Sequence, residues 1–223
     1  MCGRFTLTVD PAEIKEAFED YIFPPKFAPR YNIAPSQPVL AIPNDGLNKA
    51  DFFVWGLIPS WAKDPAIGNR LINARGETLA EKPSFRGGYK YKRCLILANG
   101  FYEWKSQPGA KTKTPHFIHL KSGKPFAFAG LWDEWISPDG SQVRSCTIVT
   151  ITPNTLMESI HNRMPVILKS GDYGQWLDKV ARTPESLNPL IQPFPAELME
   201  AYPVSMLVNS PANDRAECIL PAN

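Results

Sequence analysis

Hydrophobic positions in this chain gather in short runs that are separated by polar, proline-rich stretches. The runs are rich in β-branched and aromatic residues, a composition typical of strands. We therefore expect strands at residues 39–42, 51–55, 95–104, 116–120, 126–132, 146–151, 165–168 and 204–208. Almost all of the 23 prolines lie between these runs, as expected where paired strands need their backbone N–H groups.

Helical periodicity is limited to a few segments. A helix is expected after residues 10–13 (DPAE), because Asp10 can cap it, Pro11 suits its first turn and Glu13 completes a capping box. Apolar positions 14, 17, 18 and 21 then form one stripe. Further helices are expected near residues 155–160, 172–180 and 184–190. Many short strands and few helices predict the α+β class, with a mainly antiparallel curled sheet or open β-barrel and peripheral helices.

The composition is that of one folded domain. The chain has 223 residues, of which 43% are hydrophobic, so we expect a single domain over residues 1–223. No apolar run approaches the roughly 20 residues that span a bilayer, and no charged and then apolar leader opens the sequence. We therefore expect a cytoplasmic protein with no membrane contact.

The net charge of +2 does not by itself indicate a nucleic-acid-binding protein, so any phosphate-binding surface must be a local patch. One short stretch is basic, and two further arginines lie elsewhere. The stretch contains Arg70, Arg75, Arg86, Lys90, Lys92 and Arg93, and the separate residues are Arg4 and Arg163. A run of this kind is more often simply a solvated face.

The cysteines and histidines predict no metal site and no cofactor. Cys2, Cys94, Cys146 and Cys218 are scattered, with no C-x-x-C pair or zinc spacing. We expect free thiols, and Cys94 and Cys146 lie inside apolar runs where they would pack in the core. The three histidines are too dispersed to indicate a metal centre.

Cys2 is the residue with the most distinctive chemistry. Because Cys2 and Gly3 are small, removal of Met1 would leave cysteine as the first residue, with an amine and a thiol on adjacent carbons. The amine can attack an aldehyde and the sulfur can then close a five-membered thiazolidine ring, which no internal cysteine can do. The alternative is that position 2 is an accident of where translation begins.

Three polar residues are further candidates for chemistry. Glu103 ends an apolar strand, where burial would raise its pKa and suit it to general acid–base work. His161 follows an expected helix and can be aimed into a cleft, and Asn73 faces the same way as Arg75 if this segment is extended. Each has a simpler alternative: an arginine partner for Glu103, a helix C-terminal cation for His161 and loop hydrogen bonds for Asn73. For Arg75 the alternative is a structural role.

Six segments, taken together and in this order, resemble the SOS-response-associated peptidase (SRAP) family. They are residues 1–5 (MCGRF), 31–35 (YNIAP), 55–59 (WGLIP), 73–78 (NARGET), 100–104 (GFYEW) and 161–165 (HNRMP). The resemblance runs from Cys2 to about Glu217 and looks like that of a bacterial single-domain member. It implies the SRAP-type fold.

The resemblance also implies a function. SRAP proteins recognise abasic sites in single-stranded DNA, notably near junctions with duplex, and protect the lesion through a thiazolidine link to the N-terminal cysteine. Cys2 then matches the nucleophile, and Asn73, Glu103 and His161 match the other catalytic positions. The positions that match DNA-contacting or site-ordering residues are Arg4, Arg75, Arg86 and Arg163, with Pro35 and Trp61 where the family wedges against bases. At residues 61–63 (WAK) the chain lacks a second aromatic that some relatives carry.

The same resemblance implies a peptidase activity that removes the protein's own Met1, a monomer, and nucleoid association when bound to DNA. Two other interpretations stay open from the residues. An N-terminal-nucleophile peptidase would use Cys2, Glu103 and His161 to cleave added peptides repeatedly, whereas a crosslinking protein stays attached to DNA. A non-catalytic DNA-binding module would function unchanged when Cys2 becomes serine.

Overall fold

A closed five-stranded barrel forms the larger part of the fold in the computed structural model, which describes residues 2–109, 112–180 and 183–222. The barrel strands, in pairing order, are β4 (Asp51–Trp55), β3 (Pro38–Pro43), β6 (Arg93–Ala98), β9 (Phe126–Ile136) and β10 (Gln142–Ile151). β10 closes the ring by pairing with β4 in parallel, while the other barrel pairs are antiparallel. The expected mainly antiparallel α+β fold is confirmed, and the barrel is closed.

Short strands extend the barrel on either side of its closing pair. β5 (Asn73–Arg75) lies parallel to β10, and β11 (Met164–Pro165) pairs with the end of β10. β12 (Ile167–Leu168) pairs with β9. These additions matter for the site, because β5 carries Asn73 and Arg75, and the segment before β11 carries His161 and Arg163.

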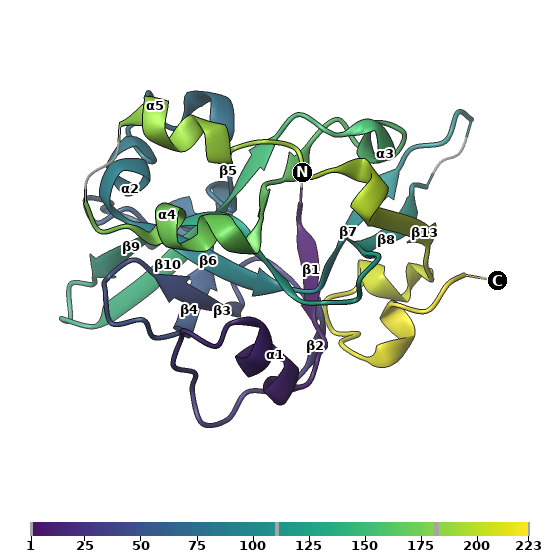
Figure 1. Ribbon diagram of the computed structural model, residues 1–223, viewed down its shortest axis with the longest axis horizontal. Coiled ribbons are helices and arrows are strands. Elements are labelled where there is room, and N and C mark those ends of the chain that lie inside the picture. The colour runs from purple at the N-terminus through teal and green to yellow at the C-terminus, as the bar shows by residue number, and fades with distance from the viewer. Residues whose placement is uncertain (1, 110–111, 181–182, 223) are drawn as a thin grey trace.

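A second, five-stranded sheet stands beside the barrel. Its order is β13 (Met199–Pro203), β8 (Thr114–Leu120), β7 (Gly100–Lys105), β1 (Arg4–Leu7) and β2 (Arg30–Ile33). Figure 1 shows β1 between the barrel strands and the strands β7, β8 and β13. The N-terminal strand therefore lies inside the molecule, where both sheets can surround the residues that precede it.

The apolar run at residues 95–104, expected as one strand, is divided between the two sheets. Asn99 separates β6 from β7, and its side chain makes hydrogen bonds to the Thr6 and Thr8 hydroxyls, 2.9 and 2.7 Å away, and to the Thr8 backbone nitrogen. These contacts let the chain leave the barrel at this point and continue beside β1.

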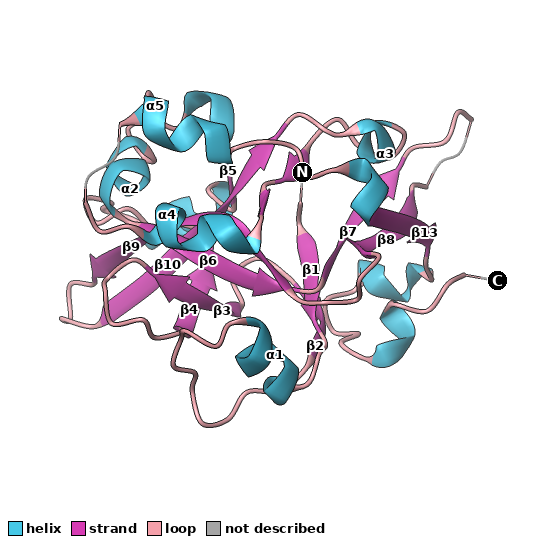
Figure 2. Cartoon of the chain, in the orientation of Figure 1, coloured by secondary structure: helices cyan, strands magenta, loops and turns pink. Residues whose placement is uncertain are grey.

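Short helices surround the sheets (Figures 1 and 2). They are α1 (Pro11–Ala17), α2 (Arg86–Tyr91), α3 (Thr155–Glu158), α4 (Tyr173–Leu177) and α5 (Pro184–Leu187). α1 begins as the sequence predicts, with the Asp10 carboxylate accepting from the Ala12 backbone nitrogen at 2.7 Å. Its Ile14 is buried, and the following Phe18 stacks on Tyr173.

The prediction of a strand at residues 204–208 is wrong. The last strand is β13, which ends at Pro203, and Met206–Asn209 form a 3₁₀ turn. The Ser205 hydroxyl accepts from the Leu207 backbone nitrogen and so caps this turn. The strands β1, β2, β5 and β13 and the helix α2 were not expected from the sequence pattern; each of these strands has five residues or fewer.

Two cations of the basic stretch, Lys92 and Arg93, are occupied by partners within the protein. Arg93 is fully buried, and its guanidinium donates to backbone carbonyls that include those of Trp176 and Asp178. Lys92 forms an ion pair with Asp133 at 2.6 Å. Neither side chain therefore belongs to a free cationic surface, and the basic patch is smaller than the sequence indicated. Cys94 and Cys146 are buried free thiols, as expected.

Candidate active site

Cys2 lies immediately before β1 and is fully buried. The Asn73 side chain, from β5, donates through Nδ2 to the Cys2 carbonyl oxygen at 2.9 Å. Asn73 Oδ1 is also buried and makes no hydrogen bond within the described part of the chain. The same amide thus fixes the backbone of Cys2 and leaves an acceptor beside it.

Glu103 approaches Cys2 from the neighbouring strand. β7 pairs with β1 so that Tyr102 faces Arg4, which puts Glu103 next to the residues that lead into β1. The residue is only 2% exposed, and this burial raises the pKa of its carboxyl. The sequence predicts both the burial and its consequence, because Glu103 follows the apolar positions 100–102.

His161 completes the group from the loop that follows α3. Its Nδ1 lies 3.9 Å from Glu103 Oε1. The Arg163 backbone flanks the same nitrogen, with its N–H donor atom at 3.0 Å and its carbonyl oxygen at 3.2 Å. Nδ1 therefore has a backbone partner whether it accepts or donates, and the ring is held in one orientation through a change of protonation.

Burial shifts the pKa values of Cys2, Glu103 and His161, and it keeps the Cys2 thiol protonated. Burial, followed by the nearby Glu103 carboxylate, raises the pKa of the Cys2 thiol, so the sulfur is protonated at neutral pH. Burial also lowers the pKa of His161, while it raises that of Glu103. Burial thus moves the pKa values of the two groups toward each other, which favours exchange of a proton between them.

The observed environments of Glu103, His161 and Asn73 bear on the simpler alternative roles for these residues. Glu103 Oε1 lies 3.9 Å from His161 Nδ1, so the structure gives Glu103 a histidine neighbour. The lowered pKa of His161 opposes a role as a permanent helix-terminal cation. Asn73 is directed at Cys2 and not at its own loop.

Two of the predicted arginines are bound within the protein. Arg163 makes a two-point ion pair with Glu77, at 2.5 and 2.9 Å, and donates to the Thr150 carbonyl at 2.7 Å. Arg4 donates to Asn32 Oδ1 and to the carbonyls of Val208 and Asn209. In this structure both guanidinium groups order the loops and segments around the site.

Arg75 and Arg86 differ from these two. Arg75 lies on β5, two residues beyond Asn73, and Arg86 begins α2. Both are exposed, and neither guanidinium makes a hydrogen bond to another described residue. The exposure leaves these two groups available to a ligand, and Asn73 and Arg75 share one face of β5, with Ala74 buried between them.

Pro35 and Trp61 lie on two segments that contact each other. Pro35 belongs to a turn in which Ser36 has a positive φ of 69°. The Ser36 hydroxyl lies 3.2 Å from Asn69 Oδ1, in the 3₁₀ helix Pro65–Arg70 that follows the turn carrying Trp61. Trp61 is 58% exposed, while the adjacent Ala62 is buried, so the indole is directed outward.

The sequence alone assigned no role to Glu77 or Asn32. Asn32 is fully buried in β2, and its Nδ2 lies within hydrogen-bonding distance of three carbonyls of the C-terminal segment, those of Val208, Ser210 and Asn213. The sequence held one signal for Asn32, because an amide between apolar neighbours in a strand indicates a buried polar group. Glu77 lies in the segment 73–78 that resembles the family, but no local pattern indicates its partner Arg163, which lies 86 positions away.

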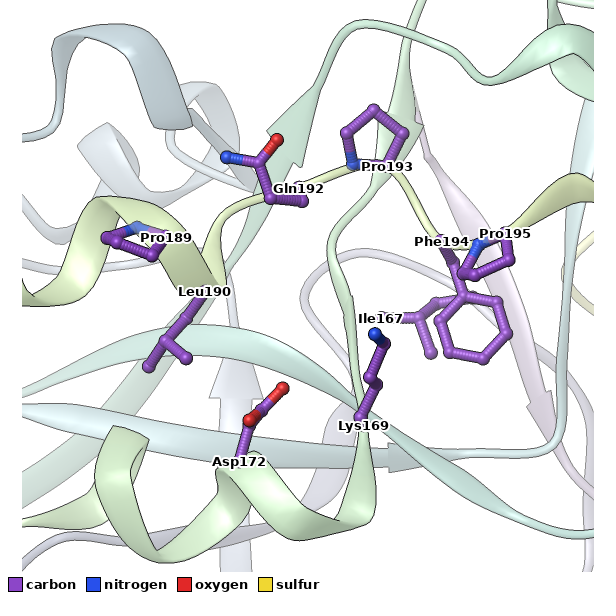
Figure 3. A pocket seen from close by; sticks show the side chains of 9 residues that line it. All are labelled: Ile167, Lys169, Asp172, Pro189, Leu190, Gln192, Pro193, Phe194 and Pro195. Atoms are coloured by element: carbon purple, nitrogen blue, oxygen red, sulfur yellow. The ribbon is translucent and has the colours of Figure 1, made fainter.

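The cavity in Figure 3 is separate from this cluster. It has a volume of about 130 Å³ and lies between Lys169 and Asp172 on one side and residues 189–195 on the other. None of the predicted site residues lines it. Among residues 2–109, 112–180 and 183–222, no group of His, Cys, Asp or Glu is placed to hold a metal ion, and no helix is long and apolar enough to cross a membrane.

Comparisons with known proteins give a consistent result. A family model described as "SOS response associated peptidase (SRAP)" matches residues 1–211. The "Abasic site processing protein YoqW" of Bacillus subtilis is 52% identical over 222 residues, covering 98% of this chain and 99% of the relative. The "Abasic site processing protein HMCES" of Gallus gallus is 32% identical, covering 99% of this chain and 78% of the relative.

A solved structure supports the fold assignment. A crystal structure of a protein from Bacteroides thetaiotaomicron superposes with a TM-score of 0.88 at 26% identity, and the match covers 100% of both chains.

Proposed function

Because the chain belongs to the SOS response associated peptidase (SRAP) family, we propose that it senses abasic sites in single-stranded DNA and links to them covalently through Cys2. The observation that carries this proposal is the cluster around Cys2: Asn73 on its carbonyl, with Glu103 and His161 beside each other. The printed names of the bacterial and vertebrate relatives, abasic site processing proteins, support the same substrate.

The first step of the proposed chemistry is removal of Met1. Hydrolysis of the Met1–Cys2 peptide bond releases the Cys2 α-amine, and we assign this step to the protein's own peptidase activity. The Asn73 Oδ1 acceptor suits an amine that carries N–H donors, so the same side chain can orient both ends of the first residue. Positioning of this kind accounts for much of the rate of a reaction between bound groups.

The abasic sugar then reacts in its open form. His161 protonates the ring oxygen as the sugar opens and the anomeric hydroxyl loses its proton, which gives the aldehyde. The Cys2 amine adds to this aldehyde, and loss of one water leaves an imine. Addition of the Cys2 sulfur to the imine carbon closes the thiazolidine, while the thiol proton passes through Glu103 to the nitrogen.

The DNA strand is held by charge rather than by sequence. We assign phosphate contacts to Arg75 and Arg86, which are exposed, and site ordering to Arg4 and Arg163, with Pro35 and Trp61 against the neighbouring bases. An abasic nucleotide has no base to unstack, so turning it out of the strand costs little. In this proposal the protein acts as a monomer in the cytoplasm, reaches the nucleoid with its DNA, and binds near single-strand to double-strand junctions.

Intact-mass spectrometry with and without abasic single-stranded DNA tests the proposal. The wild type is expected to lack Met1 and to gain the mass of the oligonucleotide minus one water. Cys2→Ala retains an N-terminal amine, so it is expected to give an adduct only when borohydride traps the imine.

Two results would contradict the assignment. A stable adduct of equal yield in Cys2→Ala without borohydride would remove the sulfur from the mechanism. Repeated cleavage of added peptides, with no attachment to DNA, would instead favour the peptidase interpretation.

A further inference from the structure

A hollow on the surface carries two exposed aromatic rings. It lies between the loop that follows β4 and the helix α2, has a volume of about 330 Å³, and has Trp61, Arg86, Gly87 and Tyr91 among its lining residues. Trp61 and Tyr91 are 58% and 54% exposed. Large rings are normally buried, so two of them facing one hollow indicate a surface made for contact.

Both rings are held by buried neighbours. Beside Trp61, the Ala62 carbonyl accepts from the indole nitrogen of the buried Trp135 at 2.7 Å. Two residues before Tyr91, Tyr89 is 3% exposed and donates through its hydroxyl to Asn188. The rings are therefore presented on a fixed backbone and need little ordering when a ligand binds.

The charges around the hollow favour an anionic ligand. The Arg86 guanidinium is exposed and makes no hydrogen bond within the described residues. Lys90 lies with its Nζ 5.2 Å from the centre of the Tyr91 ring. At the rim, Lys92 and Asp133 neutralise each other as an ion pair. Arg86 therefore lines the hollow as a cation, and Lys90 adds a second positive charge against the Tyr91 ring.

We propose that this hollow binds one unpaired base of the DNA strand, stacked on Tyr91 with Trp61 as the facing wall and the adjoining phosphate at Arg86. The inference rests on the proposed function and names a further contact, Tyr91, for the same DNA. A base stacks on an aromatic ring whatever its identity, and a cation beside the ring holds the backbone. The site therefore adds affinity for single-stranded DNA without adding sequence preference.

Gly87 allows the hollow to be filled without disturbing the fold. Gly87 lines the hollow, and a Cβ at this position would meet no atom within 4 Å, so Gly87→Leu adds a bulky side chain at the wall of the hollow without a clash. Gly174 in α4 also has no atom within 4 Å of a Cβ and does not line the hollow. Gly174→Leu is therefore the matched control, and leucine favours a helix over glycine at both sites.

The test uses single-stranded DNA with a tetrahydrofuran analogue of the abasic sugar, which has no aldehyde and binds without crosslinking. Placing 2-aminopurine at successive positions beside the analogue reports stacking as loss of fluorescence. We expect one position to be quenched by wild type and by Tyr91→Phe, and not by Tyr91→Ala or Gly87→Leu. The Kd should rise about 5- to 30-fold in the latter two, and stay within about two-fold in Gly174→Leu.

Unchanged quenching and affinity in Tyr91→Ala and Gly87→Leu would overturn the inference, as would quenching that is lost only in Trp61→Ala. Melting temperatures close to that of the wild type confirm that the variants are folded. Failure of the proposed function looks different: the wild type would not form an adduct with natural abasic DNA, whereas binding to the analogue does not depend on Cys2 chemistry.

Discussion

Replacing Glu103 by glutamine separates a catalytic role from a structural one, because the two roles predict opposite changes in stability. Glutamine keeps the shape of the side chain and cannot exchange a proton. Loss of one general acid–base group slows a reaction by about 10²–10⁴-fold. We expect a decrease in this range for both formation and reversal of the DNA adduct, while the Kd for the tetrahydrofuran analogue changes by no more than about two-fold.

The stability change follows from the burial of the carboxyl. Burial raises the pKa of Glu103 above its usual 4.5, so the native state keeps its proton to a higher pH than the unfolded chain. This preference stabilises the fold fully below about pH 4.5 and is lost as the pH rises through the native pKa. Glutamine has no charged form, so Glu103→Gln should melt at a higher temperature than the wild type at pH 8.

The size of the effect follows from how far the pKa of Glu103 differs between the native and the unfolded chain. A difference of one pH unit between these two pKa values corresponds to about 1.4 kcal/mol, and about 1 kcal/mol moves the melting temperature of a domain of this size by roughly 2–4 °C. The melting temperature of the variant should therefore lie above that of the wild type at pH 8, and the difference should shrink toward pH 4.5. His161 has a lowered pKa, so it is neutral at pH 8 and supplies no charge to offset the buried carboxylate.

Timed crosslinking and calorimetric melting curves at pH 4.5, 6 and 8 measure both quantities. Asp172→Asn, a carboxylate beside the separate cavity, serves as a control for the loss of a carboxylate elsewhere. A variant that crosslinks at the wild-type rate and melts at a lower temperature would refute the catalytic reasoning, since it would show that Glu103 serves only the fold.

Three further predictions concern the residues around the cluster. Glu77→Gln removes a negative charge from the Arg163 pair and should tighten binding of single-stranded DNA by about two- to five-fold in fluorescence titrations; weaker binding would mean that Glu77 must hold Arg163 in place. Arg86→Ala should lower the log–log salt slope of binding by about one unit or less, and an unchanged slope would exclude a phosphate contact. Asn73→Ala should slow adduct formation by about 10–100-fold with unaltered affinity, measured in single-turnover gels, whereas a normal rate would show that Cys2 does not need this amide.

The sequence predicted the strands that carry the barrel better than it predicted their connections. The runs at residues 51–55 and 146–151 are long and apolar enough to identify β4 and most of β10. β5 has three residues, and it exists because β10 offers a parallel partner, which no local pattern shows. The break at Asn99 depends on Thr6 and Thr8, some 90 positions away. The apolar pattern of residues 95–104 therefore shows no interruption there, and the sequence predicts one strand.

The local sequence predicted the burial of Glu103 better than it predicted which arginines are free to bind phosphate. The burial of Glu103 follows from its own strand, and the pairing of β7 with β1 brings it to Cys2. Arg75 and Arg163 are indistinguishable in sequence, but one is exposed and the other is held by Glu77 and Thr150. Whether a guanidinium is free for phosphate depends on partners distant in the chain, so composition overestimated the basic patch.

The burial of Cys2 constrains the order of the proposed reaction. A thiol whose pKa is raised by burial has very little thiolate at neutral pH, and the thiolate is the reactive form toward most electrophiles. The sulfur is therefore a poor first nucleophile, and the amine must attack the aldehyde before it. Once the imine has formed, its carbon is electron-poor and close to the sulfur, and Glu103 is placed to accept the thiol proton as the carbon–sulfur bond forms. A buried thiol beside a proton acceptor thus favours ring closure at a bound imine over reaction with oxidants or other thiols in solution. This selectivity would be lost if the same cysteine were exposed and ionised.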